Sequence, residues 1–163
     1  MVAQNIFFGI LAAIMIAAAL RVVTTRNVVH AALWLVVVLA GVAGQFILLG
    51  AEFVGVTQVL VYIGAVIVLF LFGIMLTRAS MGEDENVDLP NRVLPAALGA
   101  LMLFVMSYAL IDTFRDDELP RETRTTAAQV SDSIFADYIV AFEALSVLLL
   151  AALIGAIVVA RKE

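Results

Sequence analysis

The segment from Phe53 to Leu76 contains no aspartate, glutamate, lysine or arginine. About 20 apolar residues in a helix are enough to cross the hydrocarbon core of a bilayer, so this segment is long enough to span a membrane. Near its centre, however, it reads Gln58-Val59-Leu60-Val61-Tyr62-Ile63-Gly64-Ala65. Polar groups at membrane depth cost free energy unless they are paired, so this segment is the first candidate for function.

The composition of the whole chain is that of a membrane protein. Of its residues, 64% are hydrophobic and 14% are charged, whereas soluble domains average about 45–50% and about 25%. No basic patch with interleaved aromatic residues is present, which argues against nucleic-acid binding. The chain has no cysteine and one histidine, His30. It therefore lacks the ligands for an iron–sulfur cluster or a histidine metal site, and we expect no catalytic centre in this chain alone.

The apolar runs predict an all-α integral membrane protein with five transmembrane helices in a single membrane domain. Arg21 and Arg26 follow the first run and do not precede it, so we interpret that run as a retained helix and not as a signal peptide. The predicted helices cover about residues 2–20, 28–49, 53–76, 93–111 and 138–160, with loops at 77–92 and 112–137.

The distribution of positive charge predicts the orientation of these helices. Six of the nine lysine and arginine residues fall on one side of the membrane, and the other three fall in the long loop 112–137. Since positive charge is enriched on the cytoplasmic side, the N-terminus should lie outside and the C-terminus in the cytoplasm. The loop 77–92 would then be cytoplasmic and the loop 112–137 would be on the outer side.

Small residues recur at a spacing of four on four of the five helices. Such rows permit close approach of helices in lipid, and together they favour a chain that packs against other membrane subunits. The rows are Gly9/Ala13/Ala17, Ala40/Gly44, Ala96/Ala100 and Ala152/Ala156/Ala160.

The third helix carries the leading candidate residues. Gln58 and Tyr62 are four residues apart, which predicts that both lie on one helix face. Their side chains can donate and accept hydrogen bonds, so they can line a proton path or simply join neighbouring helices. Gly64 either allows the helix to deform, for example as a π-bulge, or allows close helix packing.

Two acidic residues are secondary candidates. Glu143 lies inside the fifth predicted helix, three residues before Ser146. An acid within a span is a functional candidate, although near the outer end it can also reach the membrane interface. Glu52 precedes the third helix, where its charge can stabilise the helix N-terminus.

Three stretches resemble one family. The third-helix sequence from Ala51 to Phe70 resembles subunit J of bacterial NADH–quinone oxidoreductase, the counterpart of mitochondrial complex I subunit 6. The stretches Arg26–Leu33 and Phe142–Ile157 resemble the second and last helices of that family. In two respects the chain departs from the pattern: some members carry a glutamate at the position of Gln58, and many carry a proline at the position of Val28.

The resemblance implies a core, non-redox subunit in the membrane arm of a proton-pumping NADH–quinone oxidoreductase, in the inner membrane of a bacterial cell. FMN, iron–sulfur clusters and quinone would belong to partner subunits, which include small core, quinone-module and antiporter-like subunits. Tyr62, Gly64 and Val66, with Gln58, would form a gate on a hydrated path that couples quinone reduction to proton translocation.

Two other functions remain open at this point. The chain can be a subunit of a multisubunit cation/proton antiporter, which works without quinone or an electron donor. It can also be a passive assembly scaffold, for which the small-residue rows are the motive. Neither alternative needs a catalytic residue in this chain.

Overall fold

The computed structural model describes residues 2–76, 93–115 and 125–161, and all regular structure in these ranges is helical. Contacts divide the chain into two units, Met1–Leu71 with Arg124–Glu163, and Phe72–Thr123, and each is described by itself. The predicted loop 77–92 lies outside the described residues, as do the acidic residues between 116 and 124.

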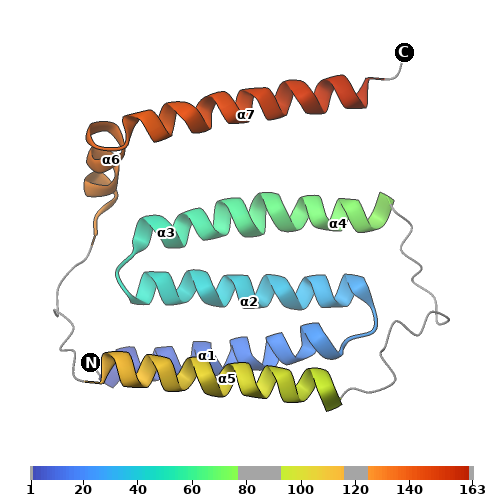
Figure 1. Ribbon diagram of the computed structural model, residues 1–163, viewed down its shortest axis with the longest axis vertical. Helices are drawn as coiled ribbons and strands as arrows, with labels where there is room; N and C mark the ends of the chain where they lie inside the picture. The colour runs from blue at the N-terminus through green and yellow to red at the C-terminus, as the bar shows by residue number, and fades with distance from the viewer. Residues whose placement is uncertain (1, 77–92, 116–124, 162–163) are drawn as a thin grey trace. The chain divides into compact units, whose positions relative to one another are not determined.

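In the first unit, helices α1 (Val2–Thr24) and α2 (Val28–Leu48) form an antiparallel pair (Figure 1). The pair packs closely because glycine faces a larger side chain: a Cβ on Gly41 would overlap Met15, and one on Gly44 would lie 3.1 Å from Leu11 Cδ1. At the far end of the pair, Gln4 Nε2 donates a hydrogen bond to the Leu48 carbonyl at 3.0 Å. The two helices are thus joined at both the centre and one end.

The turn that follows α2 is set by local chemistry. Gly50 has a φ of 77°, which a residue with a side chain rarely adopts. The N–H of Gly50 donates to the Ile47 carbonyl and that of Ala51 to the Phe46 carbonyl, at 3.0 and 2.9 Å. This pattern is a Schellman motif, and it reverses the chain so that the third span returns along α2.

The third span is continuous but is not α-helical throughout. It comprises α3 (Glu52–Thr57), the π-helix η1 (Gln58–Val66) and α4 (Ile67–Leu76), and its first two parts pack against α2. Gly55 makes the contact close, since a Cβ there would lie 2.9 Å from Ile47 Cγ1 and 3.3 Å from the Ala43 carbonyl oxygen.

The predicted outer loop 112–137 contains helical structure that the sequence analysis missed. In the second unit, α5 (Val93–Phe114) extends beyond the predicted end. In the first unit, a separate helix α6 (Ala127–Ala136) precedes the last helix, α7 (Ile139–Ala160). A capping box starts α6: the Gln129 N–H donates to Thr126 Oγ1, and the Thr126 N–H donates to Gln129 Oε1.

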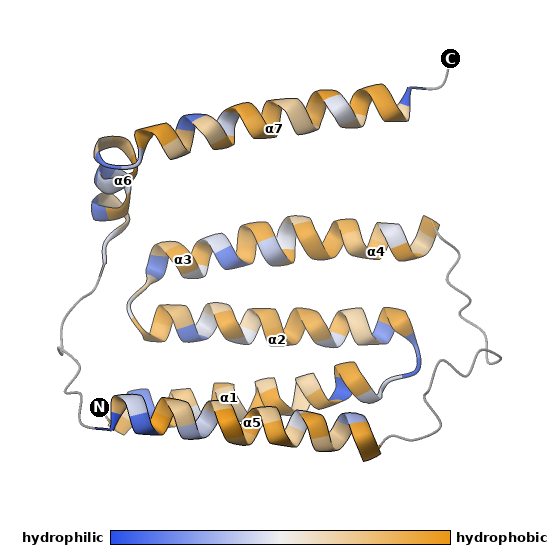
Figure 2. Ribbon diagram, viewed as in Figure 1, coloured by the Kyte–Doolittle hydropathy of each residue, from blue (hydrophilic) through white to orange (hydrophobic). Residues whose placement is uncertain are grey.

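The described residues include five helices long and apolar enough to cross a membrane, so the predicted all-α class and number of spans are confirmed. The spans are apolar around most of their circumference (Figure 2), and most large apolar side chains are exposed. Among the small-residue rows, Gly44 packs inside the chain, whereas a Cβ on Gly9 would meet nothing within 4 Å. The apolar surface of this chain is therefore available to lipid or to other subunits. The direction of insertion stays a prediction.

Candidate functional site in the third span

The candidate site is the π-helix η1, from Gln58 to Val66. In a π-helix each N–H pairs with the carbonyl five residues earlier, and here the N–H of Ile67 donates to the Tyr62 carbonyl. Each turn therefore holds one residue more than an α-turn. π-Helical segments are rare in proteins and occur frequently at functional sites.

The wider turn changes which side chains share a face. Gly55, Gln58 and Ile67 are buried and Ile63 is half-buried, so the spacing along this face is three, five and four residues. Gln58 is 8% exposed, whereas Tyr62 is 49% exposed. The two residues that the sequence predicts on one face therefore differ strongly in burial.

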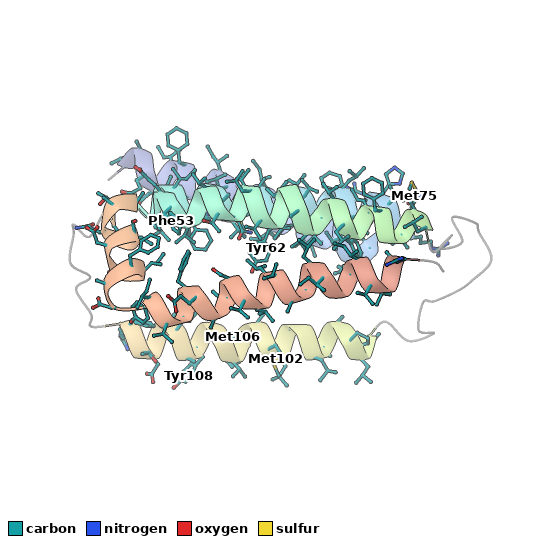
Figure 3. All side chains as sticks on the ribbon, turned by 90° about the horizontal axis from the view of Figure 1, so that it is seen from above. Phe53, Tyr62, Met75, Met102, Met106 and Tyr108 are labelled. Carbon is teal, nitrogen blue, oxygen red and sulfur yellow. The ribbon has the colours of Figure 1, made fainter. Side chains whose placement is uncertain are left out.

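Tyr62 instead projects from the side of the third span, between Phe53 and Met75 near its two ends (Figure 3). Val66 is also 49% exposed. These two side chains are four residues apart and both are open to whatever surrounds this helix. Since Gln58 is covered and they are not, η1 separates its candidate residues into an inner and an outer group.

Gly64 has room for a side chain within this structure. A Cβ there would lie 3.5 Å from the Val59 carbonyl oxygen, an ordinary van der Waals contact, and would meet no other helix within 4 Å. Close packing inside the described chain therefore does not require glycine at this position. Its conformational freedom within η1 remains the better reason, because glycine weakens an α-helix by about 1 kcal/mol relative to alanine.

Gln58 is the one buried polar residue described in the chain, and its amide forms no hydrogen bond among the described residues. No fully buried side-chain nitrogen or oxygen in those residues lacks a partner, so both amide atoms keep some accessible surface. The hydroxyl of Tyr62 also has no hydrogen bond in the described part. Among the described residues neither side chain joins two helices, and each can bind water or a group from another subunit.

A hydroxyl-to-carbonyl bond precedes η1. Thr57 Oγ1 donates to the Phe53 carbonyl at 2.9 Å. Bonds of this kind compete with the backbone ladder and often bend helices. Thr57 is not among the candidates predicted from the sequence, although a threonine directly before a polar, glycine-containing stretch of an apolar helix is a recognisable signal.

The structure does not bring the acidic candidates to η1. Glu52 is exposed in the first turn of α3, and Glu143 is exposed on α7, which has no contact with η1 in the described residues. The hydroxyl of Ser146 donates to the Phe142 carbonyl at 2.9 Å and not to Glu143. Glu143 is therefore separate from the candidate site.

The chemistry that the side chains of η1 offer is hydrogen bonding. The segment carries an amide and a phenol, and both can donate and accept hydrogen bonds. Among the described residues, no group of three histidine, cysteine or acidic residues is placed to hold a metal ion. The arrangement can orient water through the Gln58 amide and the Tyr62 hydroxyl.

Comparison with known proteins gives a consistent result over nearly the whole chain. Residues 18–159 match the family model described as NADH-ubiquinone/plastoquinone oxidoreductase chain 6. NADH-quinone oxidoreductase subunit J of Escherichia coli K12 is 40% identical, over 96% of this chain and 86% of the relative. NAD(P)H-quinone oxidoreductase chain 6 of Synechocystis is 39% identical, over 98% and 82%. F(420)H(2) dehydrogenase subunit J of Methanosarcina mazei is 41% identical, over 98% and 92%.

Proposed function

Because this chain belongs to the NADH-ubiquinone/plastoquinone oxidoreductase chain 6 family, we propose that η1 acts as a conformational gate that couples quinone reduction to proton translocation. The chain is a membrane subunit of a quinone oxidoreductase complex and has no catalytic centre of its own. It works by assembling with other subunits of that complex. The gate is a role for a helix, not for a reacting group.

The names of the three relatives include three different electron donors. These donors are NADH, NAD(P)H and F(420)H(2), and the relatives are 39–41% identical to this chain. We assign NADH as the donor here and the inner cell membrane as the location. The complex's redox cofactors belong to other subunits, and we expect FMN, iron–sulfur clusters and quinone there. Small core, quinone-module and antiporter-like subunits are the partners we expect around the five helices.

The observation that carries the proposal is the exposure of Tyr62 beside the burial of Gln58. In the π-helical state, Ile63 follows Gln58 on the face toward α2, and Tyr62 is turned outward. Conversion of η1 to an α-helix would shorten each hydrogen-bonded turn by one residue. Tyr62, Gly64 and Val66 would then rotate about the helix axis relative to Gln58. A water chain that depends on the position of the Tyr62 hydroxyl would be made in one state and broken in the other.

Deletion of Leu60 tests the gate directly. Leu60 is 66% exposed, and without it Ile63 follows Gln58 by four residues and Ile67 follows by eight. That spacing suits an α-helix, so the buried face is kept while the π-helical turn is removed. We expect the complex to assemble but proton pumping per electron to fall about tenfold, the effect of ~1.4 kcal/mol.

The matched control is Leu60→Ala, which shortens the same exposed side chain and keeps the chain length. Electron transfer from NADH to ferricyanide reports electron input without quinone, and the amount of complex in the membrane reports assembly. Normal pumping in the deletion variant, with both reports unchanged, would overturn the gate. A scaffold would give the opposite pattern, with less complex and unaltered pumping per electron.

Purification through a tag on this chain tests the wider assignment. Recovery of a flavin- and iron–sulfur-containing assembly that reduces quinone with NADH is the expected outcome. Recovery of antiporter-like membrane partners alone, without redox cofactors, would contradict it and favour a cation/proton antiporter.

A further inference from the structure

Helix α6 has a pattern unlike that of the five spans. With 10 residues it is about 15 Å long, too short to cross a bilayer. Most of its polar residues gather on one side and most of its apolar residues on the other, with Ser131 and Ala136 as the exceptions. The polar side carries Gln129, Asp132 and Ser133, and the apolar side carries Ala127, Ala128, Val130, Ile134 and Phe135. Such two-sided helices lie between an apolar and an aqueous phase.

The neighbours of α6 fix its level along the spans. It contacts α3, where the third span begins, and α7, where the last span begins. Only Asp137 and Tyr138 separate α6 from α7, and Tyr138 is exposed. Figure 1 shows α6 running across the direction of α7. A helix held between the starts of two membrane spans, and crossing their direction, lies at the membrane surface.

An aromatic contact sets how deeply the apolar side reaches. The rings of Phe135 on α6 and Phe142 on α7 are 5.0 Å apart between centroids, with an interplanar angle of 62°. Phe142 lies in the first turn of α7, so Phe135 reaches a level inside the span. Its side chain is 56% exposed. An aromatic ring at this level and with this exposure is solvated best by the acyl chains next to the headgroups.

We propose that α6 is an interfacial helix that binds phospholipid, with its apolar side toward the acyl chains and Gln129, Asp132 and Ser133 toward water. Many interfacial helices also use lysine and arginine to bind anionic lipids. The stretch 125–138 contains neither residue, and it carries Asp132 and Asp137. The binding therefore rests on apolar burial, and zwitterionic phospholipid is the lipid class that suits it. This inference does not depend on the gate.

The lack of cysteine in the chain makes a clean test possible. Ala128→Cys places a thiol on the apolar side and Ser133→Cys places one on the polar side, and both positions are exposed. Each full-length variant is spin-labelled in nanodiscs of phosphatidylcholine. Collision with oxygen reports lipid, and collision with a water-soluble nickel chelate reports solvent. We expect the oxygen-to-nickel ratio to be about fivefold higher at position 128 than at 133.

The same two variants are then labelled with a membrane-impermeant maleimide in membranes that contain the whole complex. Labelling is read on this chain alone by its mass. We expect the maleimide to label position 133 and not position 128. In nanodiscs, we expect the oxygen-to-nickel ratios to stay the same when anionic lipid replaces half of the phosphatidylcholine. Equal solvent access at both positions would overturn the proposal. Loss of labelling at both positions, with low oxygen collision at 128, would instead indicate cover by a protein subunit.

Discussion

Gln58 is buried against the face that packs on α2, and Tyr62, four residues later, is turned away from that face with 49% of its surface exposed. Ile63, five residues after Gln58, is the next residue of the π-helix that is at least half-buried. Conversion of η1 to an α-helix would rotate Tyr62 relative to Gln58, so the gate that we propose would place the two side chains differently in its two states.

Tyr62→Phe removes only the hydroxyl. Because this group has no hydrogen bond in the described part of the chain, we expect the thermal stability of the complex to change by less than about 0.5 kcal/mol. Proton pumping per electron should fall about fivefold if the hydroxyl holds part of the water chain, which corresponds to ~1 kcal/mol. Pumping is measured in sealed membrane vesicles with a pH-sensitive dye. Unchanged pumping would remove Tyr62 from the gate.

Gln58→Met replaces the amide with an apolar group of similar length. The Gln58 amide has no partner in the described residues, so we expect the amount of complex in the membrane to be kept. Coupled quinone reduction should fall, because the inner side of the gate loses its only polar group. A large loss of assembly would show instead that the amide pairs with another subunit.

Gly64→Ala restricts the backbone of η1, because alanine is more favourable than glycine in a helix by about 1 kcal/mol. The added methyl group fits, since the nearest atom to a Cβ at Gly64 is the Val59 carbonyl oxygen at 3.5 Å. We expect normal assembly and weaker coupling. The control is Gly73→Ala in α4, where a Cβ meets nothing within 4 Å. Both variants are compared by pumping per electron, and equal effects would contradict a special role for Gly64.

Gly55→Ala should reduce assembly and leave pumping per electron unchanged, the reverse of what we expect for Gly64→Ala. A Cβ there would lie 2.9 Å from Ile47 Cγ1 and 3.3 Å from the Ala43 carbonyl oxygen, so α3 must move away from α2. Overpacking of this kind costs about 1–3 kcal/mol. We expect less complex in the membrane, measured by quantitative blotting of this chain, with normal pumping per electron in the complex that remains. Normal amounts of complex would show that α3 shifts without cost.

The five spans and the approximate ends of most of them follow from the amino-acid sequence. Uncharged apolar runs of bilayer length leave a chain few alternatives, because every backbone polar group must be paired inside the hydrocarbon core. The sequence also pointed to Gln58, Tyr62 and Gly64 as the polar and flexible positions of the third span. Helix α6 was not predicted, although Thr126 and Gln129 have the spacing of a capping box.

The burial of each candidate residue of the third span depends on how the helices pack, which the sequence does not show. A sequence pattern has to be interpreted with an assumed helical period, and one extra residue per turn changes every assignment beyond it. Packing of Gly55 and Gln58 on α2, followed by Ile63 and Ile67 on the same face, requires a five-residue step. That step turns Tyr62 outward, and it depends on a neighbouring helix that no local pattern in the third span contains.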